Sequence, residues 1–146
     1  MKVLWEENIL SFLIDYYYNQ NKDKKPLETI QKEVIEAIEK LRIGDNPNEY
    51  IFIYNFNGTV IQNSVSKGNI GKNFLNVVDS KGKEVIKELI NTSKKEFGGY
   101  VDYVWFKPEI NKETNKVSYA KSYNAWNWSI GKGVYLDEID KLVHLK

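Results

Sequence analysis

The 146-residue sequence contains no cysteine, only one histidine, and no apolar run long enough to cross a lipid bilayer. Without cysteine the chain can form neither a disulfide framework nor a thiol nucleophile, an absence that fits an oxidising compartment without requiring one. The formal net charge is +1 and acidic and basic residues are interspersed, so the basic face of a nucleic-acid-binding protein is missing. No secretory signal pattern stands at the N-terminus.

Residues that would support catalysis or metal binding are also scarce. The only histidine, His144, lies near the C-terminus, where chains commonly fray. Gly68-x-x-Gly71-Lys72 lacks the spacing and the hydroxyl residue of a phosphate-binding loop, and no Asp-x-Asp-x-Asp loop for a metal is present. We therefore predict no catalytic residues, no metal and no cofactor. A small cytosolic enzyme is still kept as a minor hypothesis, which a convergent acid/base pair in a cleft would support.

Aromatic residues are abundant, with ten Tyr and four Trp, and many of them fall in the last third of the chain. Residues 100–105, 116–123 and 128–135 form three runs rich in aromatic and β-branched residues, and the short connections favour antiparallel strands. Alternation places Lys116, Ser118 and Ala120 on one face of the middle run, and Tyr119 on the other. A regular strand therefore cannot turn both Lys116 and Tyr119 toward one pocket.

Upstream, apolar spacing predicts a long helix over residues 3–19 and a second helix over residues 27–41. A short strand over 50–54, the turn former Asn57-Gly58 and a partner strand over 59–63 follow. A third helix after Lys83 leads to the three C-terminal strands. This order predicts one α+β domain over residues 1–146, with helices within 3–43 and a PAS-like five-stranded antiparallel sheet within 49–137.

Several motifs in order resemble the single Cache (sCache, PAS-like) sensor domains of bacterial chemoreceptors and sensor histidine kinases. They are Gly98-Gly99-Tyr100, Tyr103-x-Trp105-x-Lys107-Pro108, Lys116-x-Ser118-Tyr119, and Trp126-x-Trp128-x-Ile130-Gly131-x-Gly133-x-Tyr135. The hairpin over 50–61 and the loop over 68–74 are also similar to the family. One departure is that Gln62-Asn63-Ser64 replaces the family's His-Pro, which puts in doubt any ligand contact made through that histidine.

The resemblance implies an extracytoplasmic ligand-binding sensor domain of a transmembrane receptor, in the periplasm and anchored in the inner membrane in the full-length protein. Met1 is then expected to follow a removed membrane anchor, although a natural cytosolic start is the alternative. The domain itself is expected not to be an enzyme, and a kinase or cyclase output domain is left open for the full-length protein. A homodimer through the N-terminal helix is also expected.

The resemblance further implies a small organic acid ligand such as acetate, propionate, lactate or pyruvate. A carboxylate pocket needs an apolar enclosure and a few convergent donors. The candidate ligand-binding residues are Lys116 for the charge, Tyr103, Tyr119 and Gln62 for hydrogen bonds, and Phe52, Trp105 and Trp128 for the apolar wall. Arg42, at the end of the second helix, is a further candidate because its guanidinium is a forked donor.

Each candidate also has a purely structural interpretation. Lys116 could guard an exposed strand edge, Tyr103 and Trp105 could be core, and Arg42 could answer the dipole at a helix C-terminus. Trp128 fits packing better than ligand contact. The alternative function is a PAS-like protein-interaction module without a small ligand, which a closed core would favour.

Overall fold

The computed structural model describes residues 2–40 and 48–144 of the chain, with side chains described for 9–40, 48–141 and 143. The elements follow in the order α1 (Lys2–Asn21), α2 (Leu27–Lys40), β1 (Ile51–Asn55), β2 (Val60–Asn63), η1 (Lys67–Asn69), α3 (Val85–Ser93), β3 (Gly99–Lys107), β4 (Lys112–Tyr123), η2 (Asn124–Trp126), β5 (Trp128–Tyr135) and α4 (Leu136–His144).

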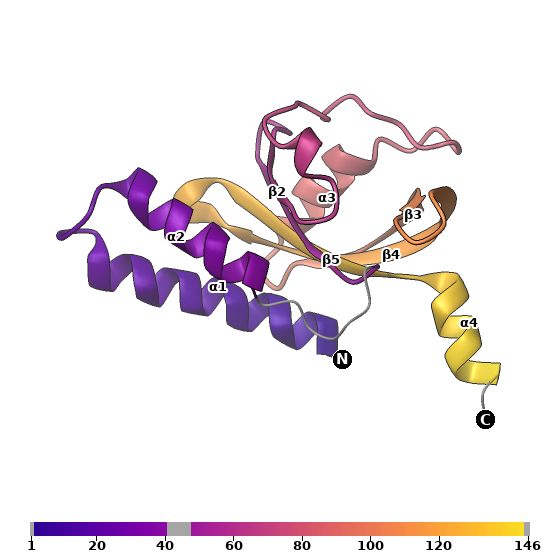
Figure 1. Ribbon diagram of the computed structural model, residues 1–146, viewed down its shortest axis with the longest axis horizontal. Helices are drawn as coiled ribbons and strands as arrows, with labels where there is room; N and C mark the ends of the chain where they lie inside the picture. Colours follow the sequence, from indigo (N-terminus) through magenta and orange to yellow (C-terminus); the bar gives the residue numbers. More distant parts are fainter. Residues whose placement is uncertain (1, 41–47, 145–146) are drawn as a thin grey trace.

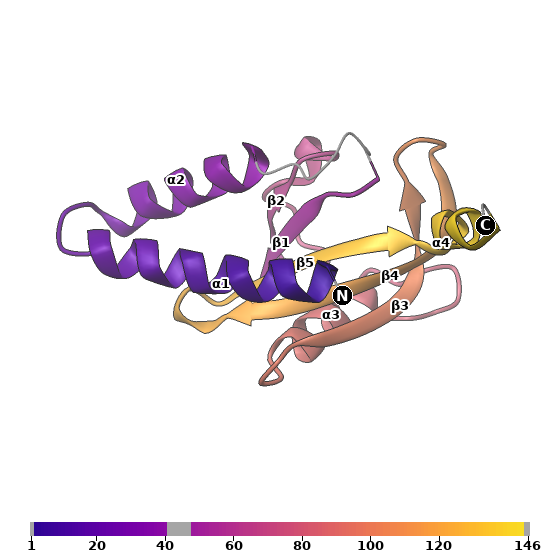
Figure 2. The same ribbon diagram turned by 90° about the horizontal axis from the view of Figure 1, so that it is seen from below.

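The five strands form one antiparallel sheet in the order β2-β1-β5-β4-β3, so the last strand lies at its centre. Figures 1 and 2 show α1 and α2 on one face of this sheet and α3 with the long loop after β2 on the other. The prediction of an α+β, PAS-like fold with two helices ahead of the sheet is confirmed.

The face under α1 and α2 buries one of two apolar clusters. The side chains of α2 that pack inward recur every four residues, at Ile30, Val34 and Ile38, as expected for one stripe of an amphipathic helix. They meet Leu10 and Ile14 of α1 and a layer from β1, β4, η2 and β5: Ile53, Tyr123, Trp126, Trp128 and Ile130. The Tyr123 hydroxyl donates to the Asp15 carboxylate at 2.9 Å and so fixes α1 to β4.

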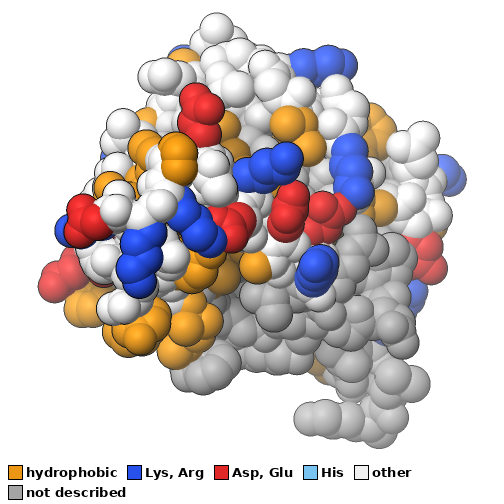
Figure 3. All heavy atoms as spheres, turned by 60° about the vertical axis from the view of Figure 1, so that its left-hand side comes forward, with side chains coloured by type: hydrophobic (Ala, Val, Ile, Leu, Met, Phe, Trp, Pro, Cys, Tyr) orange, Lys and Arg blue, Asp and Glu red, His pale blue; other side chains and the backbone are white. Residues whose placement is uncertain are grey.

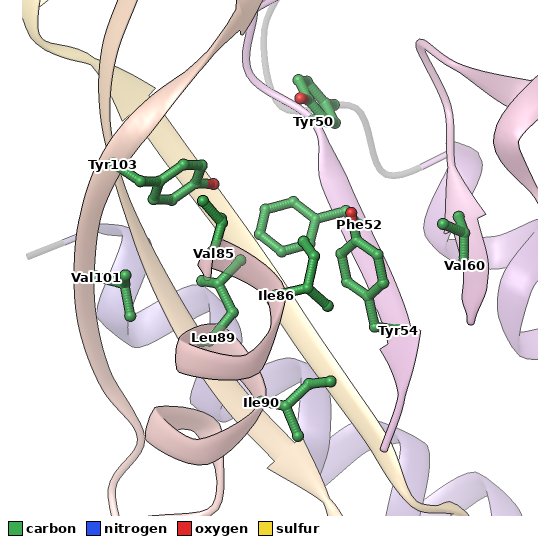
Figure 4. Close-up of a cluster of buried hydrophobic side chains, with 11 residues drawn as sticks. Tyr50, Phe52, Tyr54, Val60, Val85, Ile86, Leu89, Ile90, Val101 and Tyr103 are labelled. Atoms are coloured by element: carbon green, nitrogen blue, oxygen red, sulfur yellow. The ribbon is translucent and has the colours of Figure 1, made fainter. Parts of the chain in front are cut away.

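The opposite face buries the second cluster, between the sheet and α3. Val85, Ile86, Leu89 and Ile90 of α3 point at the sheet, because i, i+1, i+4 and i+5 share one side of a helix. Figure 4 shows these side chains facing β1 and β3, with the rings of Phe52 and Tyr103 close to the helix. This second cluster contains the candidate site.

The predicted helices and strands are confirmed in type and order, and the structure differs in the ends of some of them and in one additional helix. β4 begins at Lys112 rather than 116, because the β3–β4 hairpin keeps its pairing out to Lys107 and Lys112. The final helix, α4, was not predicted; its apolar residues Leu136, Ile139 and Val143 have helical spacing, and Asp137 and Glu138 suit a helix N-terminus. It follows Tyr135 directly, and no Gly, Pro or Asn marks the boundary between strand and helix in the sequence.

Candidate ligand-binding site

A small cavity lies between α3 and the sheet, next to the side chain of Lys116. Its free volume of about 10 Å³ is room for about one water molecule. Its lining comes from five elements and the residues beside them: Tyr50, Phe52, Tyr54, Asn63, Val85, Ile86, Leu89, Tyr103, Trp105 and Lys116. The lining is thus mostly aromatic and aliphatic, with a few polar groups converging on one end.

Lys116 supplies the only cation among these lining residues, and its side chain is 1% exposed. Its Nζ donates to the Tyr50 hydroxyl at 3.1 Å and lies 4.4 Å from the centre of the Tyr50 ring. The rings of Tyr135 and Phe52 follow at 5.1 and 5.3 Å. Among the residues that the structure describes, no Asp or Glu forms an ion pair with this ammonium. Burying a charge without a counter-charge is unfavourable, so the site is suited to an anion.

The hydroxyls around the lysine are neutral donors. Burial raises the pKa of Tyr103 well above its usual range, and burial likewise raises the pKa of Tyr54 and of Tyr135. Each of these phenols therefore keeps its proton at neutral pH. Tyr103 shares a 2.7 Å hydrogen bond with Ser118 Oγ, and Tyr135 donates to the Phe106 carbonyl at 2.5 Å. The cavity end near Lys116 thus combines one positive charge with hydroxyls and adds no negative charge.

Two glycines of the central strand make room for these side chains. A Cβ at Gly133 would lie 2.2 Å from Ser118 Oγ and 2.9 Å from Lys116 Cε. A Cβ at Gly131 would lie 2.3 Å from two ring carbons of Phe52. The neighbouring side chains therefore lie directly on the backbone of β5, which is a recognised use of glycine inside a strand.

A wide polar groove reaches the same lysine from outside. Its volume is about 780 Å³, and Tyr103 and Lys116 line both the groove and the cavity. One wall is the turn before α3, held by the buried Asp79, whose Oδ1 accepts from the backbone of Lys81 and Lys83 at 3.0 and 2.9 Å. Its Oδ2 accepts from Val104 N at 3.0 Å. Burial opposes ionisation of Asp79, but these three backbone donors lower its pKa below the usual value.

Of the residues proposed from the sequence, Lys116, Tyr103, Trp105 and Phe52 come together around the cavity. Because β4 lies between β5 and β3, Lys116 does not guard a sheet edge. Tyr103 and Trp105 also belong to the apolar cluster, so their packing role and their place at the cavity coexist.

Tyr119, Gln62 and Trp128 do not join them, because strand alternation turns these side chains to the face under α1 and α2. Trp128 packs in the cluster of that face, and Gln62 pairs with Ile53 of the same cluster. Tyr119 neighbours Lys116 closely but on the other side of β4, and its hydroxyl donates to the Phe97 carbonyl. Arg42 lies outside the described residues.

The sequence reasoning missed Tyr50, Tyr54 and Tyr135, which stand close to Lys116 or line the cavity. Tyr50 and Tyr54 share the period of two with Phe52, and that alternation was a usable signal. Tyr135 pairs directly with Lys116 across β5 and β4. Only the register of that pairing identifies it, and register cannot be read from either strand alone.

No helix within 2–40 and 48–144 is long and apolar enough to span a membrane. In that same part of the chain, no three His, Cys, Asp or Glu side chains are grouped so that they could hold a metal ion.

Comparison with known proteins places the chain in a family. Residues 7–144 match the family described as Single Cache domain 2. The chain belongs to this family. Among curated proteins, the sensor histidine kinase MctS of Rhizobium johnstonii is 34% identical over 77% of the chain. The methyl-accepting chemotaxis protein McpP of Pseudomonas putida is 25% identical over 77% of it. The single Cache chain spans 24% and 20% of the lengths of these two relatives.

Solved structures agree with this assignment. A methyl-accepting chemotaxis protein from Vibrio parahaemolyticus has a TM-score of 0.75 and 26% identity, covering 92% of the single Cache chain and 88% of its own. A structure described as showing carboxylic acid recognition by a Cache chemosensory domain has a TM-score of 0.82, with 92% and 90% covered. At 24% identity the latter shows a shared fold. Chemoreceptors and sensor kinases are thus the proteins in which this domain's relatives occur.

Proposed function

We propose that this single Cache domain is the extracytoplasmic sensor of a transmembrane receptor and that it binds a short carboxylate beside Lys116. The observation that carries the proposal is the buried ammonium of Lys116, which has one tyrosine hydroxyl and aromatic faces around it and no carboxylate paired with it among the described residues. An anion would supply the missing counter-charge and gain a charge-assisted hydrogen bond.

The proposed ligand contacts follow from the cavity lining. Lys116 binds the carboxylate, the hydroxyls of Tyr50 and Tyr103 stand ready to donate, and Phe52 and Trp105 enclose the carbon chain. A free volume of about 10 Å³ is smaller than acetate, propionate, lactate or pyruvate, so binding requires the surrounding rings to move apart. The carboxylic acid recognised by the similar Cache structure supports this ligand class.

The receptor context is proposed from the relatives. MctS is a sensor histidine kinase and McpP a chemotaxis receptor, and the single Cache chain matches about a quarter or less of each. We propose a periplasmic position for the domain, an inner-membrane receptor as the whole protein, and an output region elsewhere in it. In this arrangement the domain binds its ligand and performs no chemistry on it.

A thermal-shift panel of short carboxylates, amines, amino acids and sugars tests the ligand class. A true ligand at about one hundred times its dissociation constant adds about 2.7 kcal/mol to the free energy of unfolding. We expect at least one of acetate, propionate, lactate and pyruvate to raise the melting temperature. Stabilisation by an amine or a sugar with no response to any carboxylate would show the ligand assignment to be wrong.

A second candidate function, protein interaction without a small ligand, has one observation in its favour. Phe12, Leu13 and Tyr16 of α1 are 67%, 50% and 60% exposed, beside an apolar groove of about 580 Å³ between α1 and α2. Figure 3 shows hydrophobic side chains gathered at the lower left of one face, on the side of the molecule where Figure 1 shows α1. An exposed apolar helix face can be covered by the same face of a second copy about a two-fold axis, and we propose that a second copy of the domain covers this face.

A further inference from the structure

The C-terminal helix α4 is attached to the sheet through polar contacts of its first turn. Lys107, the last residue of β3, is 2% exposed; its Nζ lies 2.8 Å from Asp137 Oδ2 and 3.5 Å from Glu138 Oε1. Asn48, just ahead of β1, donates to Glu138 Oε1 at 2.7 Å. Figure 1 shows the helix leaving the end of β5 and pointing away from the sheet beyond this turn. We call these four residues the latch.

The hydrogen bond between Lys107 and Asp137 raises the pKa of Lys107 and lowers that of Asp137. Both groups are therefore charged throughout the neutral range, and the latch is formed there. Asn48 extends the contacts sideways, since its amide also donates to Glu109 Oε2 at 3.0 Å and accepts from Glu109 N at 3.2 Å. The first turn of α4 is thus held to β3, to the β3–β4 hairpin and to the start of β1.

Two residues beside Lys116 are joined to the latch at short range along the chain. Tyr50, whose hydroxyl accepts from Lys116, stands two residues after Asn48. Tyr135, whose ring lies 5.1 Å from the same ammonium, immediately precedes α4. Its hydroxyl donates to Phe106, the neighbour of Lys107. The two rings nearest the Lys116 ammonium therefore each lie within two residues of a latch residue.

We propose that this latch couples occupancy of the Lys116 site to the position of α4. The inference rests on the proposed carboxylate ligand. Because the cavity has room for about one water molecule, an acid must displace rings around Lys116, and Tyr50 and Tyr135 are the two nearest. Displacing them moves Asn48 and the start of α4, which strains the contacts of the latch. The latch accordingly stabilises the closed cavity, and ligand and latch oppose each other.

Coupling between two sites is reciprocal, so the direction in which latch variants change ligand affinity can be predicted. A change that weakens the latch makes the cavity easier to open and must tighten ligand binding. Asp137→Asn removes the charge pair while keeping the size of the side chain, and Glu138→Gln does the same at the next position. Both carboxylates are partly solvent-exposed, and each variant leaves Lys107 one of its two acidic partners, so we expect the variants to fold. Glu33→Gln, which breaks the 2.9 Å ion pair with Lys25 far from α4, is the matched control.

The affinity test is a calorimetric titration of acetate, propionate, lactate and pyruvate into the 146-residue chain and each variant. For the acid that binds tightest, we expect Asp137→Asn and Glu138→Gln to lower the dissociation constant at least about fivefold, the lower end of typical coupling. Glu33→Gln is expected to leave it unchanged. Circular dichroism verifies that each variant is folded.

The position of α4 is measured directly with two spin labels. Because the chain has no cysteine, cysteines introduced at Lys141 of α4 and at Glu113 of the hairpin are the only labelling sites. We expect the distance between the labels to change when the acid is added, and the distance of a control pair at Lys24 and Glu113 to stay the same. Binding with unchanged affinity in both latch variants, or with an unmoved α4, would refute the latch and leave the proposed function intact. If none of the acids binds the parent chain, both proposals are wrong.

Discussion

Replacing Lys116 with methionine separates a ligand-binding lysine from a structural one. Methionine has a similar length and no charge. In the parent protein the ammonium donates a hydrogen bond to the Tyr50 hydroxyl, worth about 1.5–3 kcal/mol for a charged group, and contacts the Tyr50 ring, worth about 0.5–2 kcal/mol. Burying the ion costs several kcal/mol in the opposite direction. We therefore expect the free energy of unfolding without ligand to be unchanged or raised by up to about 2 kcal/mol.

The effect on ligand affinity has the opposite sign. The variant loses a charge-assisted hydrogen bond of about 1.5–3 kcal/mol to the carboxylate, and 1.4 kcal/mol corresponds to a factor of ten. The expected result is roughly 10- to 150-fold weaker binding of the best acid, measured by isothermal calorimetry. Lys112→Met, an exposed position on the same strand, is the control and is expected to bind like the parent chain. An unchanged dissociation constant for Lys116→Met, or a large loss of unfolding free energy, would contradict this account of the site.

Three further changes test other parts of the structure. Gly133→Ala pushes a methyl group against Ser118 and Lys116, so we expect weaker carboxylate binding by calorimetry, whereas Gly68→Ala, with nothing within 4 Å, serves as a neutral control. Asp79→Asn removes a carboxylate that accepts three backbone hydrogen bonds and should lower the unfolding free energy by about 1–3 kcal/mol at pH 7, with Asp23→Asn as control. The pKa of Asp79 is lowered in the folded state, so the stability that its charge contributes is present above its unfolded pKa near 3.8 and is lost as the pH falls through the folded value. The free energies of unfolding of Asp79→Asn and of the parent chain should therefore converge in acid. Leu13→Ser should weaken a dimer seen by sedimentation over a wide concentration range, while Phe97→Ser, at another exposed apolar position away from α1, should not. A parent chain that is monomeric at every concentration would count against pairing through α1.

The sequence was sufficient for much of the fold because periodicity acts locally. Alternation within β4 correctly grouped Lys116 with Ser118 and Ala120 and separated Tyr119 from them. What it could not supply was the register between strands. Phe52 and Gln62 were both proposed for the site, yet Gln62 pairs with Ile53 and so shares the opposite face. The register between β1 and β2 shifts between Ile53 and Tyr54, and no residue type in the sequence predicts such a shift.

The same limitation explains Trp128 and Tyr135. Their parity on β5 was evident from the sequence, since they fall on opposite faces. Which of those faces holds the cavity depends on the pairing of Tyr135 with Lys116. Trp128 was proposed for the cavity because it is a large aromatic residue. The strand pairing instead places Tyr135 beside Lys116 and Trp128 on the opposite face. Motif resemblance pointed to Lys116 as a candidate, and only the structure shows which side chains surround it.

The glycines of β5 have a consequence for how ligand preference can change. Gly131 and Gly133 have no side chain, so no substitution at these two positions can enlarge the cavity for a larger ligand. Any residue added there would collide with Phe52 or Ser118 before it reached a ligand. Variation in ligand size must therefore arise from the strands and helix on either side, with Phe52 and Ile86 as the accessible positions. A library for redesigning this sensor should hold both glycines constant and diversify those two positions.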